Sequence, residues 1–254
     1  MTCVTVYAVE DPDNGYMQVT EQKHVAEIVA EMPAAARLFE RYKIDYCCGG
    51  KRPVGEACQE KGVSFDEIRA GLAAIAAPAG QSRDWTGAEA GELIDHIIGK
   101  HHSFLKEELP RLDQLLTKIV NKRYHHLAPA LDIFLGLKAE LDQHLLKEEM
   151  ILFPYVLRLE QASKAGSTPA SPPFGTVRNP IRMMEREHET AGNALRELRA
   201  STNDYEVPEG VCNTYRAVMA SLQELEADLH MHIHLENNLL HPRAAALEEA
   251  LAAV

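Results

Sequence analysis

The chain has 254 residues, a net charge of −12 at neutral pH and an apolar fraction of 46%. That length suits one large domain with a small one, and the apolar fraction is ordinary for a globular protein. The acidic balance argues against a nucleic-acid surface, which needs basic side chains. We see no apolar run long enough to span a membrane and no secretion signal. Five scattered cysteines do not form a disulfide framework, so we expect a reduced, cytoplasmic protein.

The domain organisation follows from composition and periodicity. Residues 1–19 form an N-terminal arm that we assign to no domain. Residues 20–77 predict a small domain of short helices, and 78–85, rich in Pro, Gly and Ser, predict a linker. Residues 86–246 contain four long amphipathic helices with a long loop at about 161–179. The predicted fold is all-α: an antiparallel four-helix bundle preceded by the small domain.

The limits of two bundle helices have local signals. Thr86 and Glu89 form a capping box, which predicts the start of the first long helix. Proline is favoured in the first turn of a helix, so we expect the third long helix to begin at Pro180.

The histidines are concentrated in the bundle, where eleven of the twelve lie between His96 and His241. Two segments, HLLKEEMILFP (144–154) and HIHLENNLLHP (232–242), both contain His-x3-Glu and a proline ten residues after the histidine. These segments are an internal repeat. Residues four apart lie on one face of a helix, so each imidazole and carboxylate can reach the same interior point. The two pairs are His144 with Glu148 and His232 with Glu236.

Two further histidines, His102 and His188, lie in the apolar seams of the first and third long helices. A lone histidine on an apolar face, or a single His-x3-Glu, is usually structural. Two aligned copies with a histidine in each remaining helix instead favour a metal site, because buried carboxylates need paired charge or a metal. Six imidazole and carboxylate ligands suit two ions bridged by the glutamates. The lack of thiolates favours iron or manganese, whereas zinc usually takes four ligands.

The other histidines are less informative. His230 and His234 lie away from the ligand face of their helix, so we expect them to be exposed or to lie behind the ligands. His101 competes with His102, because both touch the apolar stripe. No role is predicted for His24, His125 and His126.

The motif DYCCGG (45–50) places Cys47 beside Cys48. A disulfide between neighbours would be strained, which leaves buried apolar residues or thiols that bind iron or exchange electrons. Three cations flank the motif, Lys43, Lys51 and Arg52. Because such cations lower the pKa of a thiol, we favour exposed, reactive thiols.

The C-terminal region resembles a hemerythrin-like domain. DYCCGG together with DHIIGKHHSFLKEELPRL, HLLKEEMILFP, MEREHETAG and HIHLENNLLHP is similar, over about residues 20 to 245, to the repair of iron centres (RIC) family of YtfE/ScdA type. The resemblance implies a bacterial cytoplasmic di-iron protein that restores iron–sulfur clusters damaged by nitric oxide or peroxide. It also favours His102 over His101. The ligand set that it implies is His102, His144, Glu148, His188, His232 and Glu236.

The resemblance also implies the state of the metal. Two non-haem irons with oxo and carboxylate bridges are expected. Oxygen-carrying hemerythrins have a fifth histidine, whereas Gly192 stands one turn after His188, which implies an open coordination position. His241 stands where the first copy of the repeat has Phe153, and no role is predicted for it.

Three functions stay open. The leading hypothesis is a repair factor that supplies iron to damaged iron–sulfur proteins, with Cys47 and Cys48 as redox or iron-transfer thiols. The alternatives are a di-iron enzyme that binds and reduces nitric oxide or peroxide, and a hemerythrin-like module that senses or carries oxygen or nitric oxide. The missing fifth histidine disfavours an oxygen carrier. Glu140 and Glu187 are candidate carboxylates behind the ligands or along a channel. Both a monomer and a homodimer are compatible with the sequence.

Overall fold

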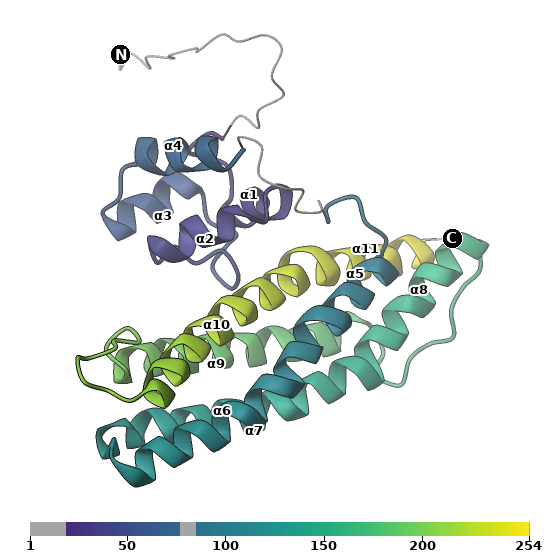
Figure 1. Cartoon of the computed structure of the whole chain (residues 1–254). Coiled ribbons are helices and arrows are strands. Elements are labelled where there is room, and N and C mark those ends of the chain that lie inside the picture. Colours follow the sequence, from purple (N-terminus) through teal and green to yellow (C-terminus); the bar gives the residue numbers. More distant parts are fainter. Residues whose placement is uncertain (1–18, 77–84, 254) are drawn as a thin grey trace, which may run out of the picture.

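The computed structural model describes residues 19–76 and 85–253. All secondary-structure elements within those two stretches are helices, so the predicted all-α fold is confirmed. A small group of helices lies over one side of a long bundle (Figure 1). The predicted arm, apart from Val19, and the linker, apart from Trp85, lie outside the described residues. Within the described part of the chain, no helix is long and apolar enough to cross a membrane.

The small domain contains four short helices: α1 (Val25–Glu31), α2 (Ala35–Arg41), α3 (Val54–Lys61) and α4 (Phe65–Ala76). Ile28, Phe39 and Ile68 are fully buried in its core. The same core includes Ile233, which belongs to the bundle. The small domain is therefore docked on the bundle through a shared apolar cluster.

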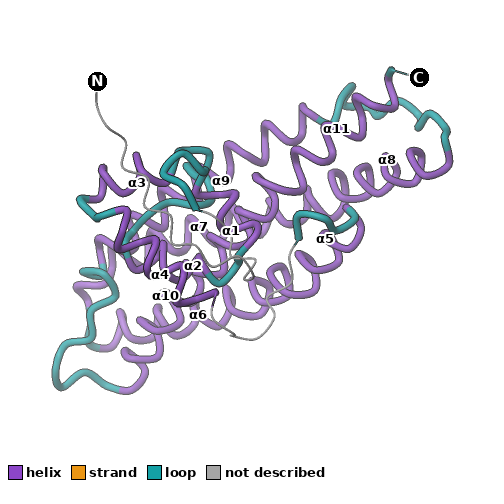
Figure 2. The backbone as a smooth tube through the Cα atoms, turned by 90° about the horizontal axis from the view of Figure 1, so that it is seen from above, coloured by secondary structure: helices purple, strands orange, loops and turns teal. Residues whose placement is uncertain are grey.

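Each long bundle helix is a continuous rod, and three of the four contain a π-helical turn. The tube view shows the rods running side by side (Figure 2). The first comprises α5, η1 and α6, the second α7, η3 and α8, and the fourth α10, η4 and α11; η2 (His125–Leu127) joins the first two. Their limits are α5 (Ala90–His96), η1 (Ile97–His102), α6 (Ser103–Lys122), α7 (Ala128–Lys147), η3 (Glu148–Leu152), α8 (Phe153–Ala165), α9 (Arg178–Ser201), α10 (Asn213–Leu235), η4 (Glu236–Leu240) and α11 (His241–Ala252).

The π turns lie at one level of the bundle and contain three of the predicted ligands. A π-helix bonds each N–H five residues back, and such turns are frequent at functional sites. Pro154 and Pro242 are the second residues after η3 and η4. Because proline has no N–H and clashes with the carbonyl four residues back, it disfavours a regular α-helix at this point. The prolines of the repeat therefore account for the widening of both helices.

The first long helix starts later than predicted. Glu89 is the N-cap residue and α5 begins at Ala90, so the expected capping box at Thr86 does not form the start. Glu160 of α8 instead accepts a hydrogen bond from the N–H of Ala90 at 2.6 Å. The cap is supplied from another helix, which local spacing does not reveal.

The long loop is shorter than the predicted 161–179. The helix α8 continues to Ala165 and ends at Gly166, whose φ of 60° is a conformation that glycine adopts without strain. The helix α9 begins before Pro180, at Arg178. Glu248 accepts the N–H of Val177 at 2.9 Å, so a side chain from α11 fixes this start.

The bundle interior is divided into two apolar clusters. One includes Leu109, Leu137 and Leu222, and the other includes Ile97 and Leu240. The π turns and the polar residues around them lie between the clusters. The buried polar side chains at this level are His101, His102, His144, Glu148, His188, His232, Glu236, Asn237 and His241.

Candidate metal centre

The structure brings the six predicted ligands together in this polar layer, where each is at most 3% exposed. Their ligand atoms form two groups of four, and within each group all atoms lie within 4.8 Å of one another. One group is His102, Glu148, His232 and Glu236, and the other is His144, Glu148, His188 and Glu236. Both glutamates therefore belong to both groups.

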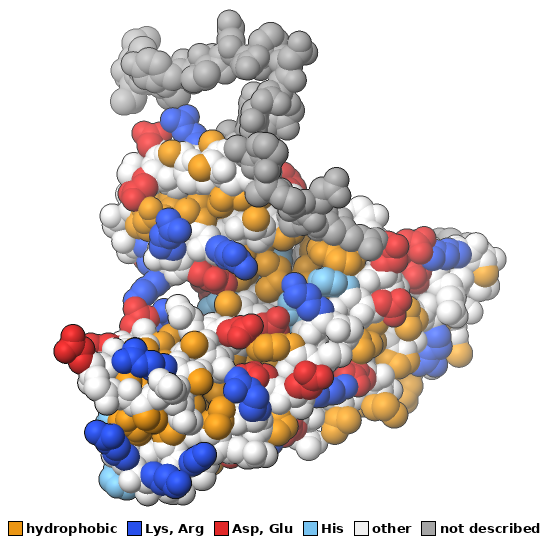
Figure 3. Space-filling view, in the orientation of Figure 1, with side chains coloured by type: hydrophobic (Ala, Val, Ile, Leu, Met, Phe, Trp, Pro, Cys, Tyr) orange, Lys and Arg blue, Asp and Glu red, His pale blue; other side chains and the backbone are white. Residues whose placement is uncertain are grey.

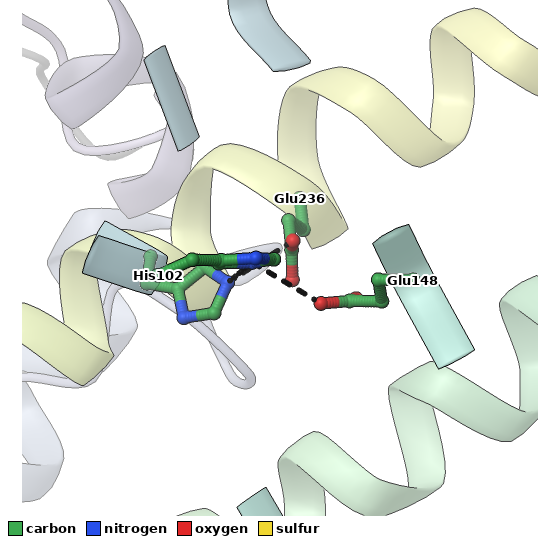
Figure 4. A group of neighbouring side chains, drawn as sticks. His102, Glu148 and Glu236 are labelled. Carbon is green, nitrogen blue, oxygen red and sulfur yellow. Dashed lines mark hydrogen bonds and ion pairs between the residues drawn. The ribbon is translucent and has the colours of Figure 1, made fainter. Parts of the chain in front are cut away.

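Each glutamate presents one oxygen to each group. In Glu148, Oε2 lies 3.4 Å from Nε2 of His102 and Oε1 lies 3.3 Å from Nε2 of His144. His102, Glu148 and Glu236 point toward one another from three different helices (Figure 4). In Glu236, each oxygen lies 3.1 Å from one Nε2, that of His188 or that of His232. Each carboxylate therefore contacts a histidine of both groups.

The histidines expose their Nε2 lone pairs to the interior. His102 and His144 direct Nδ1 outward to Glu149 and Glu187, at 2.7 and 2.8 Å. A carboxylate accepts the Nδ1–H, and a neutral imidazole that donates from Nδ1 has only an acceptor at Nε2. Yet Nε2 of His102 lies 3.2 Å from Nε2 of His232, and the carboxylate oxygens are acceptors as well. A layer of facing acceptors needs cations, either protons or metal ions.

Without a metal, protons must balance the two carboxylates. Burial opposes a charge on His144, but Glu148 and Glu236 outweigh burial and raise the pKa of His144 to about 9. Burial and repulsion by Glu236 oppose the charge of Glu148, but His144 and His102 outweigh them and lower its pKa to about 2. The layer therefore holds negative charge that attracts either protons or metal ions.

Sequence comparison places this centre in a known family. Residues 93–244 match the hemerythrin HHE cation binding domain, and residues 21–76 match a domain of unknown function, DUF542. An iron–sulfur cluster repair protein YtfE of Pectobacterium atrosepticum is 37% identical over 228 residues, which cover 87% of this chain and 95% of the relative. The YtfE proteins of Dickeya chrysanthemi and Escherichia coli O81 are 35% and 37% identical, over 87% and 88% of this chain and 95% and 97% of their own lengths.

The chain belongs to the YtfE family. The resemblance drawn from the motifs is confirmed. The hemerythrin HHE domain implies iron binding, and the two groups of the histidine–glutamate layer could hold the metal.

The repeat extends beyond the ligands to the residue after each bridging glutamate. Glu149 follows Glu148 and binds Nδ1 of His102, whereas Asn237 follows Glu236 and binds Nδ1 of His188 at 2.8 Å. Sequence reasoning missed Glu149 and Asn237 as partners. Their equal positions in the two copies of the repeat were the signal that could have found them.

The residues directly before His102 and His188 are His101 and Glu187, and each contacts a histidine of another helix. Glu187, a predicted candidate, lies behind His144 and pairs with Lys147 as well. In the equivalent place His101 stacks parallel to His232, with ring centroids 5.8 Å apart, and its Nδ1 pairs with Asp228 at 2.8 Å. His101 is in neither ligand group. The two metal positions therefore have different surroundings.

Glu140, the other candidate carboxylate, is exposed. It lines a small cavity together with His144, Glu187 and His188. The cavity places Glu140 beside these residues, but among the described residues no hydrogen bond joins it to them.

The expectation for His234 was partly wrong. It is not exposed: it is buried beneath the small domain, and its Nδ1 lies 3.2 Å from the carbonyl oxygen of Tyr46. His230 is half-buried, and its ring meets the edge of the Tyr46 ring. The docked small domain covers this face of α10, which a single helix pattern cannot show.

The two cysteines of DYCCGG differ in exposure. Cys47 is buried, and its N–H and thiol lie 2.9 and 3.3 Å from Oδ1 of Asp45. Cys48 is exposed, and its Sγ lies 3.8 Å from the carbonyl oxygen of His188. The motif therefore contacts the helix that carries a ligand.

The prediction of two exposed, acidified thiols is wrong for Cys47. The hydrogen bond with Cys48, followed by burial, raises the pKa of Cys47 well above its usual value. Two of the flanking cations are engaged elsewhere, Lys43 with Asp204 and Arg52 with Glu60. Of the two cysteines in the motif, only Cys48 has the exposure expected of a reactive thiol.

Glycines allow the motif to approach both the small domain and the bundle. A Cβ at Gly50 would lie 2.3 Å from the Tyr46 carbonyl oxygen, so no side chain fits there. A Cβ at Gly192 would lie 3.8 Å from Sγ of Cys48, so Cys48 faces the position one turn after His188. Both cysteines line a cavity of about 490 Å³ between the two domains. Acidic and basic side chains are intermixed where the domains meet (Figure 3).

Proposed function

We propose that the chain holds two iron ions bridged by Glu148 and Glu236 and supplies iron for the repair of damaged iron–sulfur clusters. The observation that carries this proposal is that both glutamates belong to both ligand groups. A single structural zinc needs only four ligands, whereas two groups with two common members suit two ions. Imidazole and carboxylate donors without thiolate favour iron over metals that prefer soft sulfur ligands.

The surroundings of the centre support iron release as well as binding. Each metal position has two imidazoles and two carboxylate oxygens, which is fewer than the six ligands of an octahedral site. Behind the ligands, Glu149 and Glu187 pair with Lys106 and Lys147 near the surface. A ligand whose outer partner is shared with a lysine at the surface is easier to release than one whose partner is fixed in the core.

Cys48 is suited to receive iron. It is the exposed thiol of the motif and contacts the backbone of His188, a ligand of the second group. Damaged iron–sulfur proteins are the proposed clients, as the names of the relatives state for those proteins. Thiolate is a ligand of iron–sulfur clusters, so a thiol intermediate matches the destination.

Transfer of labelled iron tests the proposal. The protein is loaded with ⁵⁷Fe and mixed with an iron–sulfur dehydratase damaged by nitric oxide, in the presence of a chelator that removes free iron. The proposal predicts that activity returns and that ⁵⁷Fe appears in the client cluster. Recovery with metal-free protein, or consumption of nitric oxide without iron transfer, contradicts it; the second result supports a di-iron enzyme instead. Cys48→Ser should slow the transfer, while Cys212→Ser, another exposed thiol, serves as the control.

A further inference from the structure

His241 is a buried imidazole beside the centre that the ligand set does not use. Its side chain is 2% exposed, and neither ring nitrogen has a hydrogen-bond partner among the described residues. A buried polar group without a partner is destabilising, and such groups in native proteins mark functional positions or bound ligands. Packing alone does not account for a histidine here.

The repeat supplies a direct comparison. Phe153 occupies the corresponding position and stacks on His102, with centroids 5.6 Å apart and planes at 25°. His241 stacks on His188, with centroids 6.0 Å apart and planes at 5°. A phenyl ring thus meets the packing requirement on one side of the centre. On the other side the imidazole adds at least one N–H donor, whether it is neutral or charged.

The π turn η4 places His241 against the centre. Glu236 opens this turn and His241 follows it, so the i to i+5 relation of a π-helix aligns the two residues along one face. His241 is in neither ligand group, so it does not coordinate a metal in this arrangement. It lies beside His188, next to the metal position that His144 and His188 hold.

That metal position has four protein donors, which is two fewer than an octahedral site takes. Its protein donors are two imidazoles and two shared carboxylates, and the residue one turn after His188 is Gly192, which offers no side chain. A ligand bound there in a water-poor interior needs a hydrogen-bond donor from the protein. Hydrogen bonds to a charged acceptor are the stronger kind, which favours an anion.

We infer that His241 donates an N–H hydrogen bond to a small anion bound at the metal position of His144 and His188. This role rests on the proposed two-iron centre and makes its two halves functionally different. The half that contains Phe153 has no equivalent donor, because a phenyl ring donates no hydrogen bond.

Azide binding to the diferric protein tests the role without any repair assay. An optical titration measures the azide dissociation constant, and metal analysis measures iron per chain. His241→Phe copies the other half of the repeat and should weaken azide binding about 10- to 100-fold while leaving iron content unchanged. His241→Gln, which keeps an N–H donor, should recover part of the affinity. Phe153→Leu is the matched control and should leave azide affinity unchanged.

Four results overturn the role. His241→Phe could bind azide as the wild type does, or the wild type could hold two irons and give no azide response; in both cases the proposed function stands. Loss of iron from His241→Phe would show instead that His241 is itself a ligand. A wild type that does not load two metal ions overturns both this inference and the proposed function.

Discussion

The Nε2 atoms of His144 and His188 lie 3.0 Å apart in the middle of the bundle. Their outer nitrogens donate to Glu187 and Asn237, so the two inner lone pairs face each other. Only a proton or a metal ion between or beside them makes this approach favourable. Protonation and metal binding therefore compete for the same atoms.

This competition predicts proton release. The pKa of His144 is raised to about 9 in the metal-free chain, so its ring carries a proton at pH 7 that must leave before Nε2 binds a metal. Apparent iron affinity should therefore rise with pH up to about 9 and level off above it. Calorimetry in buffers of different ionisation enthalpy measures the released protons. Heats that do not depend on the buffer at pH 7 would contradict the prediction.

The same shift predicts how the metal-free fold responds to pH. A pKa raised from 6.5 to about 9 adds stability that is fully present below pH 6.5 and is lost as the pH rises through about 9. The midpoint of denaturant unfolding of the metal-free protein should fall across this window. The iron-loaded protein, in which His144 is neutral, should show no such fall.

The two glutamates that belong to both ligand groups predict unequal effects of substitution. Glu148→Ala or Glu236→Ala removes an oxygen from both ligand groups, so both metal ions should be lost together. His230→Ala, on the same helix as Glu236 but outside both groups, should keep near-normal iron content. Metal analysis of the three purified variants checks this. Retention of one tightly bound iron in Glu148→Ala would show that the carboxylate does not bridge.

The residues behind the ligands predict a graded loss of affinity. Glu187→Gln removes the charge that orients His144, and such changes typically lower metal affinity about 10- to 100-fold. Asp228→Asn should have a smaller effect, because Asp228 bonds to His101 and not to a ligand. Competition with a chromophoric chelator measures both. An equal or larger loss in Asp228→Asn would show that His101 also orients His232.

The two cysteines predict a difference in thiol reactivity. Cys48 is exposed, whereas Cys47 is buried and its pKa is raised well above the usual value. An alkylating reagent at neutral pH should therefore modify Cys48 first, and peptide mass spectrometry over time distinguishes the two. Faster labelling of Cys47 would mean that the motif does not keep this conformation in solution.

The fold and the ligand set follow from patterns that the local chain carries. The periodicity of the apolar residues predicted the long helices, and His-x3-Glu predicted that His144 and Glu148 share a face, as they do. The limits of α5 and α9 were missed because Glu160 and Glu248 cap them from other helices. Such contacts depend on tertiary packing and leave no local signal.

The domain interface was the least predictable part. His234 and Cys47 are buried because the small domain lies on α10, with Ile233 in the shared core. The apolar pattern of a helix in one domain contains no information about the other domain. Glu149 and Asn237 were within reach of the sequence, since the repeat places both directly after a bridging glutamate.

Metal analysis with Mössbauer spectroscopy, on protein purified from iron-replete cells, tests the central claim most directly. The shared carboxylates predict two irons per chain, coupled to each other, and a near-ultraviolet absorption typical of an oxo-bridged diferric centre. A single zinc per chain, or an intact fold with no bound metal, would contradict the two-iron centre.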